Sequence, residues 1–348
     1  KSDVSFEMRE RSRAMAVREY EENDDPMARI KRRKVSLTDL FGDLPDDLVV
    51  CILLRLSSSS SRPSDFFNAS YACKRFHSLA FSPLVLAKAS EEVFSIRASK
   101  WCESAHQFML RCIEAGNIEA SYTLGMVSYS ILSSSSSLLS ALFQIRFYCL
   151  KNRGSGASLM ARAAMRSHTA ALYSLAVIQF NGSGGTKNDK DLRAGVALCA
   201  RAASLGHIDA LRELGHCLQD GYGAVQNIRE GRRLLIVAHA RDLATRANHS
   251  PKVHPANRFL LEWFAARESL ARELRICSHE ACGRPETRCH EFRRCSICGW
   301  VNYCSRGCQA LDWKVRHKVE CDPVERWVEL ANDDGDDVDM TDVAVVAD

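Results

Sequence analysis

Apolar residues recur at helical spacing near the start of the chain. Leu48, Ile52 and Leu56 follow one another every four residues, so they share one face of a helix. Pro45 stands in the expected first turn, where a missing N–H costs nothing, and two aspartates follow it beside the positive end of the helix dipole. This pattern predicts an amphipathic helix whose apolar stripe contacts another surface.

Two further elements are expected after this helix. The serine run Ser57–Pro63 predicts a flexible loop from its composition. Asp65 is then placed to cap a second helix over 66–80, and a short third element is expected over 82–86. We therefore predict a helical unit over 37–90.

An internal repeat occupies the middle of the chain. The segment from His168 and the segment from His207 align at an offset of 39 residues, with leucines and glycines in register, and an earlier copy begins at Arg111. One helical hairpin cannot bury its own apolar face, so the copies must stack. The sequence predicts an α-solenoid over 100–245 and a capping or connecting helix over 246–275.

One segment breaks the repeat. Deleting residues 127–144, which are rich in serine and leucine, restores the register of the whole copy. We expect an inserted loop or a poorly packed helix extension there. A retained intron is the sharper alternative, because the segment begins with a valine codon and ends with a glutamine codon.

Composition and charge narrow the class of protein. The 348 residues are 46% hydrophobic and carry a net charge of only +4, which makes strong attraction of the whole molecule to nucleic acid unlikely. No stretch reads as a signal peptide or a membrane span, so we expect a soluble intracellular protein that is not attached to a membrane. The arm 1–36 and the acidic tail 328–348 are expected to be disordered. The basic cluster Arg29–Lys34 indicates either a nuclear import signal or a solvated charge run, so the nucleus, the cytoplasm or both are expected.

The most specific signal is a cluster of cysteines near the C-terminus. Eight potential ligands fall in four closely spaced pairs, and in a reducing compartment such clusters indicate metal sites rather than disulfides. Zinc takes four such donors, so eight predict two closed structural Zn²⁺ sites with no open position for water. The spacing alone leaves sequential and interleaved pairing both open. The pairs are Cys277 with Cys282, Cys295 with Cys298, Cys304 with Cys308, and His317 with Cys321.

The N-terminal helical unit resembles an F-box. The resemblance rests on Leu44-Pro45, the stripe after it, Cys73-Lys-Arg-Phe76 and Ser82-Pro83-Leu84. It implies a three-helix motif that docks on the Skp1 adaptor of a cullin-containing ubiquitin ligase. The residues expected to contact the adaptor are Leu44, Pro45, Leu48, Ile52 and Leu56.

The other two regions also resemble known families. The repeats resemble Sel1-like repeats, which are related to tetratricopeptide repeats and imply a concave protein-binding surface. The ligand spacing, with Tyr303 before a ligand and Asp312-Trp313 in the following helix, resembles a MYND zinc finger over 277–321. That resemblance implies interleaved sites, one formed by Cys277, Cys282, Cys304 and Cys308 and the other by Cys295, Cys298, His317 and Cys321. It also implies that Gln309 and Trp313 contact a proline-rich peptide, whereas the plainer interpretation is that Trp313 packs the small core.

The order of the three regions resembles a plant F-box family. It implies a mainly α protein that serves, without catalytic activity, as the substrate-recognition subunit of a Skp1–cullin–F-box ubiquitin ligase. The main alternative is a MYND scaffold in transcriptional regulation without a ligase role. A SET-type lysine methyltransferase is disfavoured because the remaining sequence is helical repeat, and DNA binding is disfavoured because no recognition helix stands out.

Overall fold

The structure is a computed structural model that describes residue 41 and residues 44–127, 153–183, 186–248, 253–266, 275–288 and 290–323. The chain divides into two units, Lys1–Leu44 and Pro45–Asp348. Of the first unit, only Phe41 and Leu44 are described, so the account below concerns the second unit. The expectations for 1–36, for 128–144 within the insertion and for 328–348 lie outside the described residues. In the described ranges, no helix has both the length and the apolar character needed to cross a bilayer.

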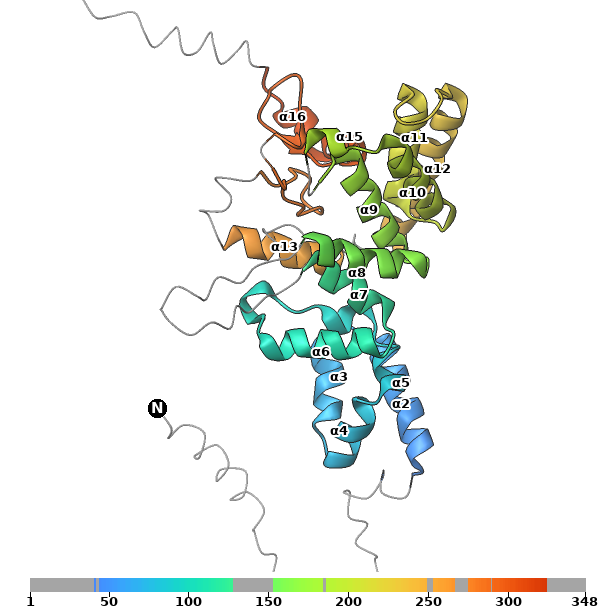
Figure 1. The fold of residues 1–348 in the computed structure, drawn as a ribbon, viewed down its shortest axis with the longest axis vertical. Coiled ribbons are helices and arrows are strands. Elements are labelled where there is room, and N and C mark those ends of the chain that lie inside the picture. The colour runs from blue at the N-terminus through green and yellow to red at the C-terminus, as the bar shows by residue number, and fades with distance from the viewer. Residues whose placement is uncertain are drawn as a thin grey trace, which may run out of the picture. The chain divides into compact units, whose positions relative to one another are not determined.

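The fold is mainly helical, as predicted, and begins with four short helices (Figure 1). Helix α2 starts directly after Pro45 and buries Val49 and Leu53, which lie one turn apart. This buried stripe leaves the neighbouring stripe of Leu48 and Ile52 exposed. The helices of this region are α2 (Asp46–Ser59), α3 (Pro63–Ser70), α4 (Lys74–Ala80) and α5 (Pro83–Leu86).

Two local predictions for this region are wrong. The expected single helix over 66–80 is broken, because the Cys73 sulfur accepts a hydrogen bond from the Phe76 N–H and so caps a separate helix α4. The serine run is not a loop throughout, because Ser57–Ser59 continue α2 and their hydroxyls donate to carbonyls one turn earlier. Asp65 lies inside α3 rather than before it, and it accepts hydrogen bonds from the N–H groups of Ser61 and Arg62.

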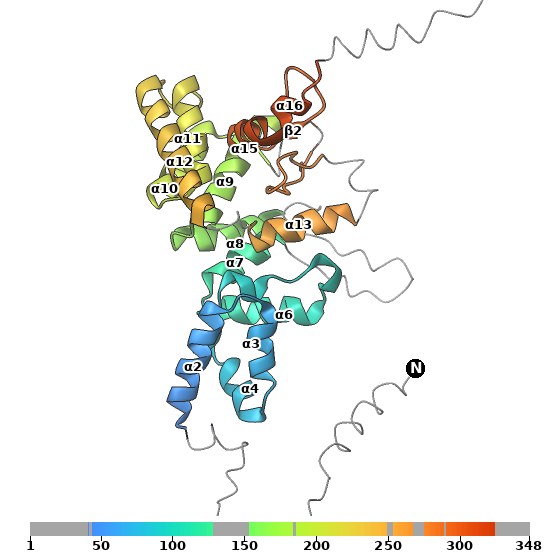
Figure 2. The same cartoon turned by 180° about the vertical axis from the view of Figure 1, so that it is seen from behind.

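The predicted repeats form a stack of antiparallel helices in which each helix packs on the next (Figures 1 and 2). His168 and His207 occupy matching N-cap positions, and in each the ring nitrogen Nδ1 accepts a backbone N–H of the helix that follows. Gly215 permits close packing of the last pair, because a Cβ there would lie 2.8 Å from the Leu235 Cγ. The repeat helices are α6 (Glu103–Glu114), α7 (Ile118–Met126), α8 (Arg153–Met165), α9 (Thr169–Asn181), α10 (Leu192–Ser204), α11 (Ile208–Asp220) and α12 (Ile228–Asn248).

Asn117 joins the first helical region to the repeats. Its side-chain oxygen caps α7 by accepting the Ala120 N–H, while its side-chain nitrogen donates to the carbonyls of Leu86 and Ala89, each at 2.9 Å. The side chain is 2% exposed, so these hydrogen bonds are shielded from water. The two regions therefore share one hydrogen-bonded junction.

The helix after the repeats does not cap their C-terminal end, which corrects the expectation for 246–275. Helix α13 (Pro255–Ala265) instead returns to α7, η1 (Glu91–Phe94) and η2 (Ala98–Lys100) near the start of the stack. Phe259 packs against Trp101 with ring centroids 5.2 Å apart, and the Glu262 carboxylate accepts the Ala98 N–H at 3.0 Å. Burial of the apolar face of α13 against the first hairpin explains this placement.

The C-terminal region contains little regular structure. A two-stranded antiparallel ribbon, β1 (Arg293–Arg294) with β2 (Asn302–Tyr303), precedes helix α15 (Arg306–Asp312). The chain then makes a π-helical turn, η4 (Trp313–His317), and a short α16 (Lys318–Glu320).

Candidate metal centre and its contact with the repeats

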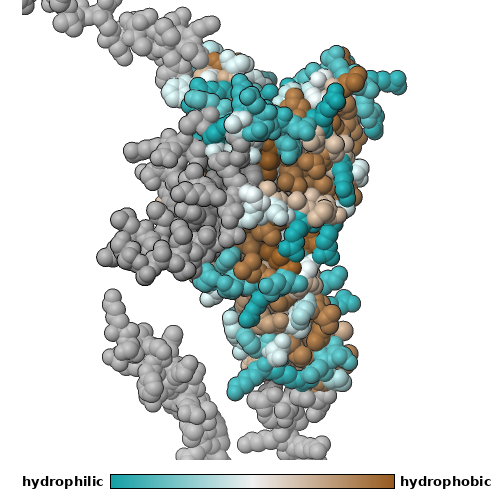
Figure 3. Space-filling view, in the orientation of Figure 1, coloured by the Kyte–Doolittle hydropathy of each residue, from teal (hydrophilic) through white to brown (hydrophobic). Residues whose placement is uncertain are grey.

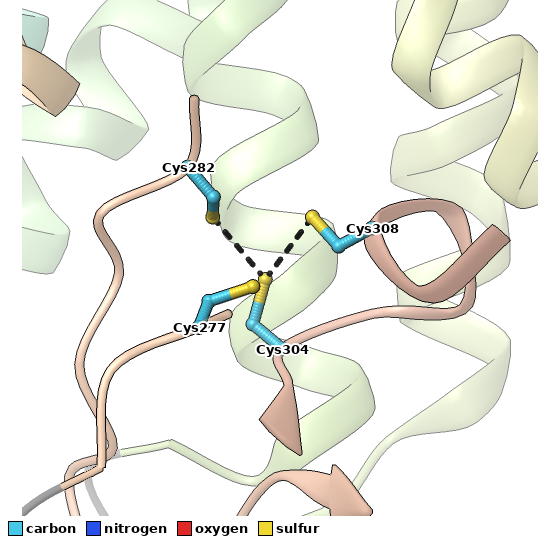
Figure 4. Close-up of side chains that lie close together, drawn as sticks. All are labelled: Cys277, Cys282, Cys304 and Cys308. Atoms are coloured by element: carbon cyan, nitrogen blue, oxygen red, sulfur yellow. Dashed lines mark hydrogen bonds between the residues drawn. The ribbon is translucent and has the colours of Figure 1, made fainter. Parts of the chain in front are cut away.

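Four buried cysteine sulfurs converge in the first cluster (Figure 4). The Sγ of Cys304 lies 3.5 Å from that of Cys282 and 3.6 Å from that of Cys308, and Cys277 completes the group. Tetrahedral zinc with Zn–S bonds of about 2.3 Å separates its sulfurs by about 3.8 Å. The cluster therefore has the size and the donor set of a structural zinc site.

The second cluster contains three sulfurs and one ring nitrogen. The Sγ atoms of Cys295 and Cys321 are 3.9 Å apart, and the Cys298 Sγ lies 3.5 Å from the Nε2 of His317. Zinc bonds of about 2.3 Å to sulfur and 2.0 Å to nitrogen predict S···N separations of about 3.6 Å. The arrangement is compatible with two zinc sites, and the structure groups the eight donors in the interleaved manner that the MYND resemblance implied.

The local fold brings the interleaved ligands together. Cys295 follows β1 and Cys304 follows β2, and the Cys295 N–H bonds the Val301 carbonyl across the turn between the strands. Ser305 caps α15 by accepting the Cys308 N–H at 3.1 Å, which fixes that ligand in the first helical turn. A π-helical turn then ends at His317, and turns of this kind are frequent at functional sites.

A buried carboxylate of the repeats holds the start of α15. Glu213 in α11 is 2% exposed, and its two oxygens accept the N–H groups of Gly307, at 2.5 Å, and Arg306, at 3.3 Å. These are N–H groups of a first helical turn, which have no partner inside their own helix. Burial raises the pKa of Glu213, while these hydrogen bonds act in the opposite direction. A carboxylate from one region thus completes the hydrogen bonding of a helix in another.

Equivalent positions of two successive repeats contact the finger. Ser174 in α9 lies 39 residues before Glu213, and its hydroxyl accepts a hydrogen bond from Arg284 at 2.9 Å. Asn181 lies 39 residues before Asp220. The Asn181 side chain donates to the Cys304 carbonyl at 2.8 Å, and Asp220 pairs with Arg306 at 3.0 Å. The repeat therefore presents the same two positions of each helix to the finger.

The loop before β1 adds a third line of contact. The Glu291 carboxylate accepts the N–H and the hydroxyl of Thr287, both at 2.6 Å, and also bonds the Ser183 hydroxyl. Arg288 donates to the carbonyls of Asn181 and Gly182, which end α9. The repeat surface formed by these residues of α9 and α11, which was expected to bind a partner protein, is thus occupied by the finger of the same chain.

Sequence reasoning did not single out Glu213, Ser174, Asn181 or Arg284. The 39-residue offset was visible, but attention went to the apolar positions that pack helix on helix. A buried acid in an otherwise apolar repeat helix was the available signal. Its partner is a backbone N–H almost a hundred residues away, which spacing along the chain does not reveal.

A third cluster of metal-ligating residue types lies outside the finger, where Glu119 faces His168 and His254. In both histidines Nδ1 accepts a backbone N–H as a helix cap, so the neutral ring carries its proton on Nε2. Each Nε2 donates to Glu119, at 2.8 Å from His168 and 3.0 Å from His254. Binding a metal through Nε2 requires losing those protons, so this cluster is a clamp between α7, α9 and α13 rather than a metal site.

The two residues predicted to contact a peptide line one groove. Gln309 and Trp313 lie one helical turn apart and face helices α11 and α12 across a groove of about 1030 Å³. Trp313 is partly exposed, and its ring also lies beside that of His317, with centroids 5.7 Å apart. The plainer interpretation, that Trp313 only packs a core, therefore accounts for part of its surface.

The five residues predicted to contact an adaptor differ in exposure. Leu48 is 50% exposed and Ile52 is 43% exposed, and both project from α2 away from its buried stripe. Pro45 is exposed, whereas Leu56 is partly buried. Leu44 is partly buried within the first unit, where its N–H bonds the Phe41 carbonyl.

Comparison with known proteins matches these regions to families. The family model for the F-box domain matches residues 41–88, and that for the MYND finger matches residues 277–321. F-box protein At1g67340 of Arabidopsis thaliana is 54% identical over 331 residues, which cover 84% of this chain and 83% of that protein. F-box protein At5g50450 of the same plant is 55% identical over 318 residues, covering 85% of this chain and 89% of that protein.

The chain belongs to the F-box protein family. This F-box protein combines an F-box domain, Sel1-like repeats and a MYND finger. A Sel1 repeat protein from Oxalobacter formigenes is 14% identical, with a TM-score of 0.40, and the match covers 65% of this chain and 85% of that one. F-box proteins are in general substrate adaptors, and the domain implies binding to an adaptor of the Skp1 type, while the MYND finger indicates protein interaction.

Proposed function

We propose that this F-box protein is the substrate-recognition subunit of a Skp1–cullin–F-box ubiquitin ligase and has no catalytic activity of its own. The exposed apolar face of α2 carries the proposal. Leu48 and Ile52 are about half exposed within the F-box match, and burying the rest of each side chain against a partner is worth roughly 1 kcal/mol. An adaptor docked on this face would link the chain to a cullin.

The far end of the molecule is the proposed recruiting surface. Gln309 and Trp313 line the groove between the finger and the repeats, and the flat ring of tryptophan suits the rings of a proline-rich segment. The two zinc sites contribute rigidity rather than chemistry, because each donor set is complete with four protein ligands. The proposed substrate is therefore a protein that inserts an extended segment into the groove.

Affinity purification from plant cells treated with a proteasome inhibitor tests the whole proposal. The wild type should capture Skp1, cullin and ubiquitinated targets. The double variant Leu48→Asp with Ile52→Asp should capture the same targets, without ligase subunits and without ubiquitin. Targets that stay ubiquitinated on the double variant would favour the alternative of a MYND scaffold outside the ligase.

The peptide site has its own test. Gln309→Ala and Trp313→Ala should each reduce capture of the targets while leaving two zinc ions per chain and normal binding to Skp1. Val319→Ala is the matched control, because Val319 is exposed on the next helical segment but does not line the groove. Unchanged capture by the Trp313 variant would mean that recruitment occurs elsewhere.

We also propose that the protein acts in the nucleus, the cytoplasm or both. The basic cluster Arg29–Lys34 supports import, and its residues belong to the sequence alone. Replacing the cluster by alanines in a fluorescent fusion should shift the protein toward the cytoplasm. An unchanged distribution would identify the cluster as a solvated charge run.

A further inference from the structure

The groove between the finger and the last repeat helices has two apolar walls. Leu235 and Leu243 of α12 form one wall, and Ile297 and Trp313 of the finger belong to the other. Both views of the fold show α15 beside α11, with α12 behind that helix (Figures 1 and 2). Figure 3 shows apolar side chains exposed over the repeat helices on one face of the molecule. The space of about 1030 Å³ suits an extended peptide rather than a single side chain.

The groove also carries positive charge that the described residues do not neutralise. Asp220 and Asp242 line it, but Asp220 pairs with Arg306 at 3.0 Å and Asp242 lies 3.8 Å from Arg212. Among the described residues, no carboxylate forms an ion pair with the exposed guanidinium of Arg293. The Lys314 amine contacts only a neutral ring nitrogen, the Nδ1 of His239, at 3.4 Å. An occupant with carboxylates beside apolar side chains would therefore match both features.

We propose that residues 324–348 of the same chain occupy this groove and cover the peptide site. Residues 333–348 contain seven aspartates and no basic residue, and Val343, Val345 and Val346 supply apolar side chains. Charge complementarity therefore holds between the segment and the Arg293 and Lys314 side of the groove. The valines match the walls formed by Leu235 and Trp313.

The starting point of the segment favours this occupant over a separate protein. The segment begins two residues after the zinc ligand Cys321, and His317 of the same cluster lines the groove. Nine residues, 324–332, span up to about 30 Å when extended. A tethered segment has an effective concentration in the millimolar range, so a weak interaction suffices for occupancy.

The consequence is competition for the groove. An incoming target must displace the segment before it reaches Gln309 and Trp313, so acidic targets and high salt should both weaken the covering. This inference rests on the groove as the peptide site and not on adaptor binding. Variants of the segment should leave the affinity for Skp1 unchanged, so the two proposals can fail separately.

Carbodiimide cross-linking of the full, zinc-loaded chain tests the inference, because the reagent joins carboxylates to lysine amines in contact. Lys314 lines the groove, and Lys318, exposed one turn later, does not line it and serves as the control. At low protein concentration, mass spectrometry should find residues 333–348 joined to Lys314 several-fold more often than to Lys318. Arg293→Glu should abolish this selectivity, while zinc content and helical circular dichroism stay unchanged.

A second variant and an isotope mixture complete the design. Replacing Asp333, Asp334, Asp336 and Asp337 by asparagine should reduce the selectivity without touching the finger. Equal cross-linking to both lysines, no cross-linking of the segment, or selectivity that survives Arg293→Glu would overturn the proposal. In a mixture of ¹⁴N and ¹⁵N chains, cross-links that join the two isotopes would assign the groove to a second copy and would also overturn it.

Discussion

The Glu213 carboxylate in the last repeat hairpin accepts the backbone N–H of Gly307 in the zinc finger at 2.5 Å. This contact joins two regions that the sequence presents as separate modules. Because Gly307 lies between the ligands Cys304 and Cys308, the repeat helix holds the segment that carries half of the first metal cluster. Finger and repeats are therefore expected to behave as one structural unit.

Replacing Glu213 by alanine should destabilise that unit. Two first-turn N–H groups of α15 would lose their acceptor in a buried environment, which costs about 1–3 kcal/mol. Urea unfolding followed by circular dichroism measures the loss. Glu230→Ala serves as the control, because Glu230 forms a surface pair with Arg233 and its removal should change little. An equal loss in both variants would contradict the assigned role.

Removal of zinc should lower the stability of the repeats as well as the finger. Without metal, the thiolates of Cys304 and Cys308 repel one another and the segment between them loses its fixed geometry, so Glu213 loses its partner. Thermal melting at 222 nm reports mostly the repeats and should shift to lower temperature after chelation, then recover when zinc is added. Repeats that melt at the same temperature with and without chelator would show that the two regions are independent.

Glu119 should make stability depend on acid pH. Burial opposes its ionisation, but hydrogen bonds from His168 and His254 outweigh this effect and lower the pKa of Glu119 to about 2, from an ordinary value of 4.5. The folded state therefore favours the carboxylate. Its contribution is present above pH 4.5 and is lost as the pH falls from there toward 2. A shift of this size corresponds to at most about 3 kcal/mol.

The comparison with Glu119→Gln isolates this carboxylate from the effect of acid on zinc binding, which is common to both proteins. The wild type should be more stable at pH 7, and the difference should shrink below pH 4.5. Urea unfolding at several pH values measures it. A difference that stays constant down to pH 3 would mean that the clamp works through shape rather than through charge.

Local spacing explains what the sequence predicted well. Ligand pairs lie within a few residues of one another, and matching helices recur at a fixed offset, so the zinc ligands and repeat helices could be recognised without coordinates. The break before α4 was missed because Cys73 reads as an apolar residue on a helix face, whereas its sulfur acts as a cap. The return of α13 to the first hairpin and the docking through Glu213 depend on contacts between distant residues, which no local pattern contains.

The affinity for purified Skp1 tests the central claim most directly. Isothermal titration calorimetry would compare the wild type with the double variant Leu48→Asp and Ile52→Asp, using Ile236→Asp as the control because Ile236 is equally apolar and 70% exposed on α12. The account predicts binding by the wild type and the Ile236 variant and no binding by the double variant. Undiminished binding by the double variant, or no binding by the wild type, would contradict it.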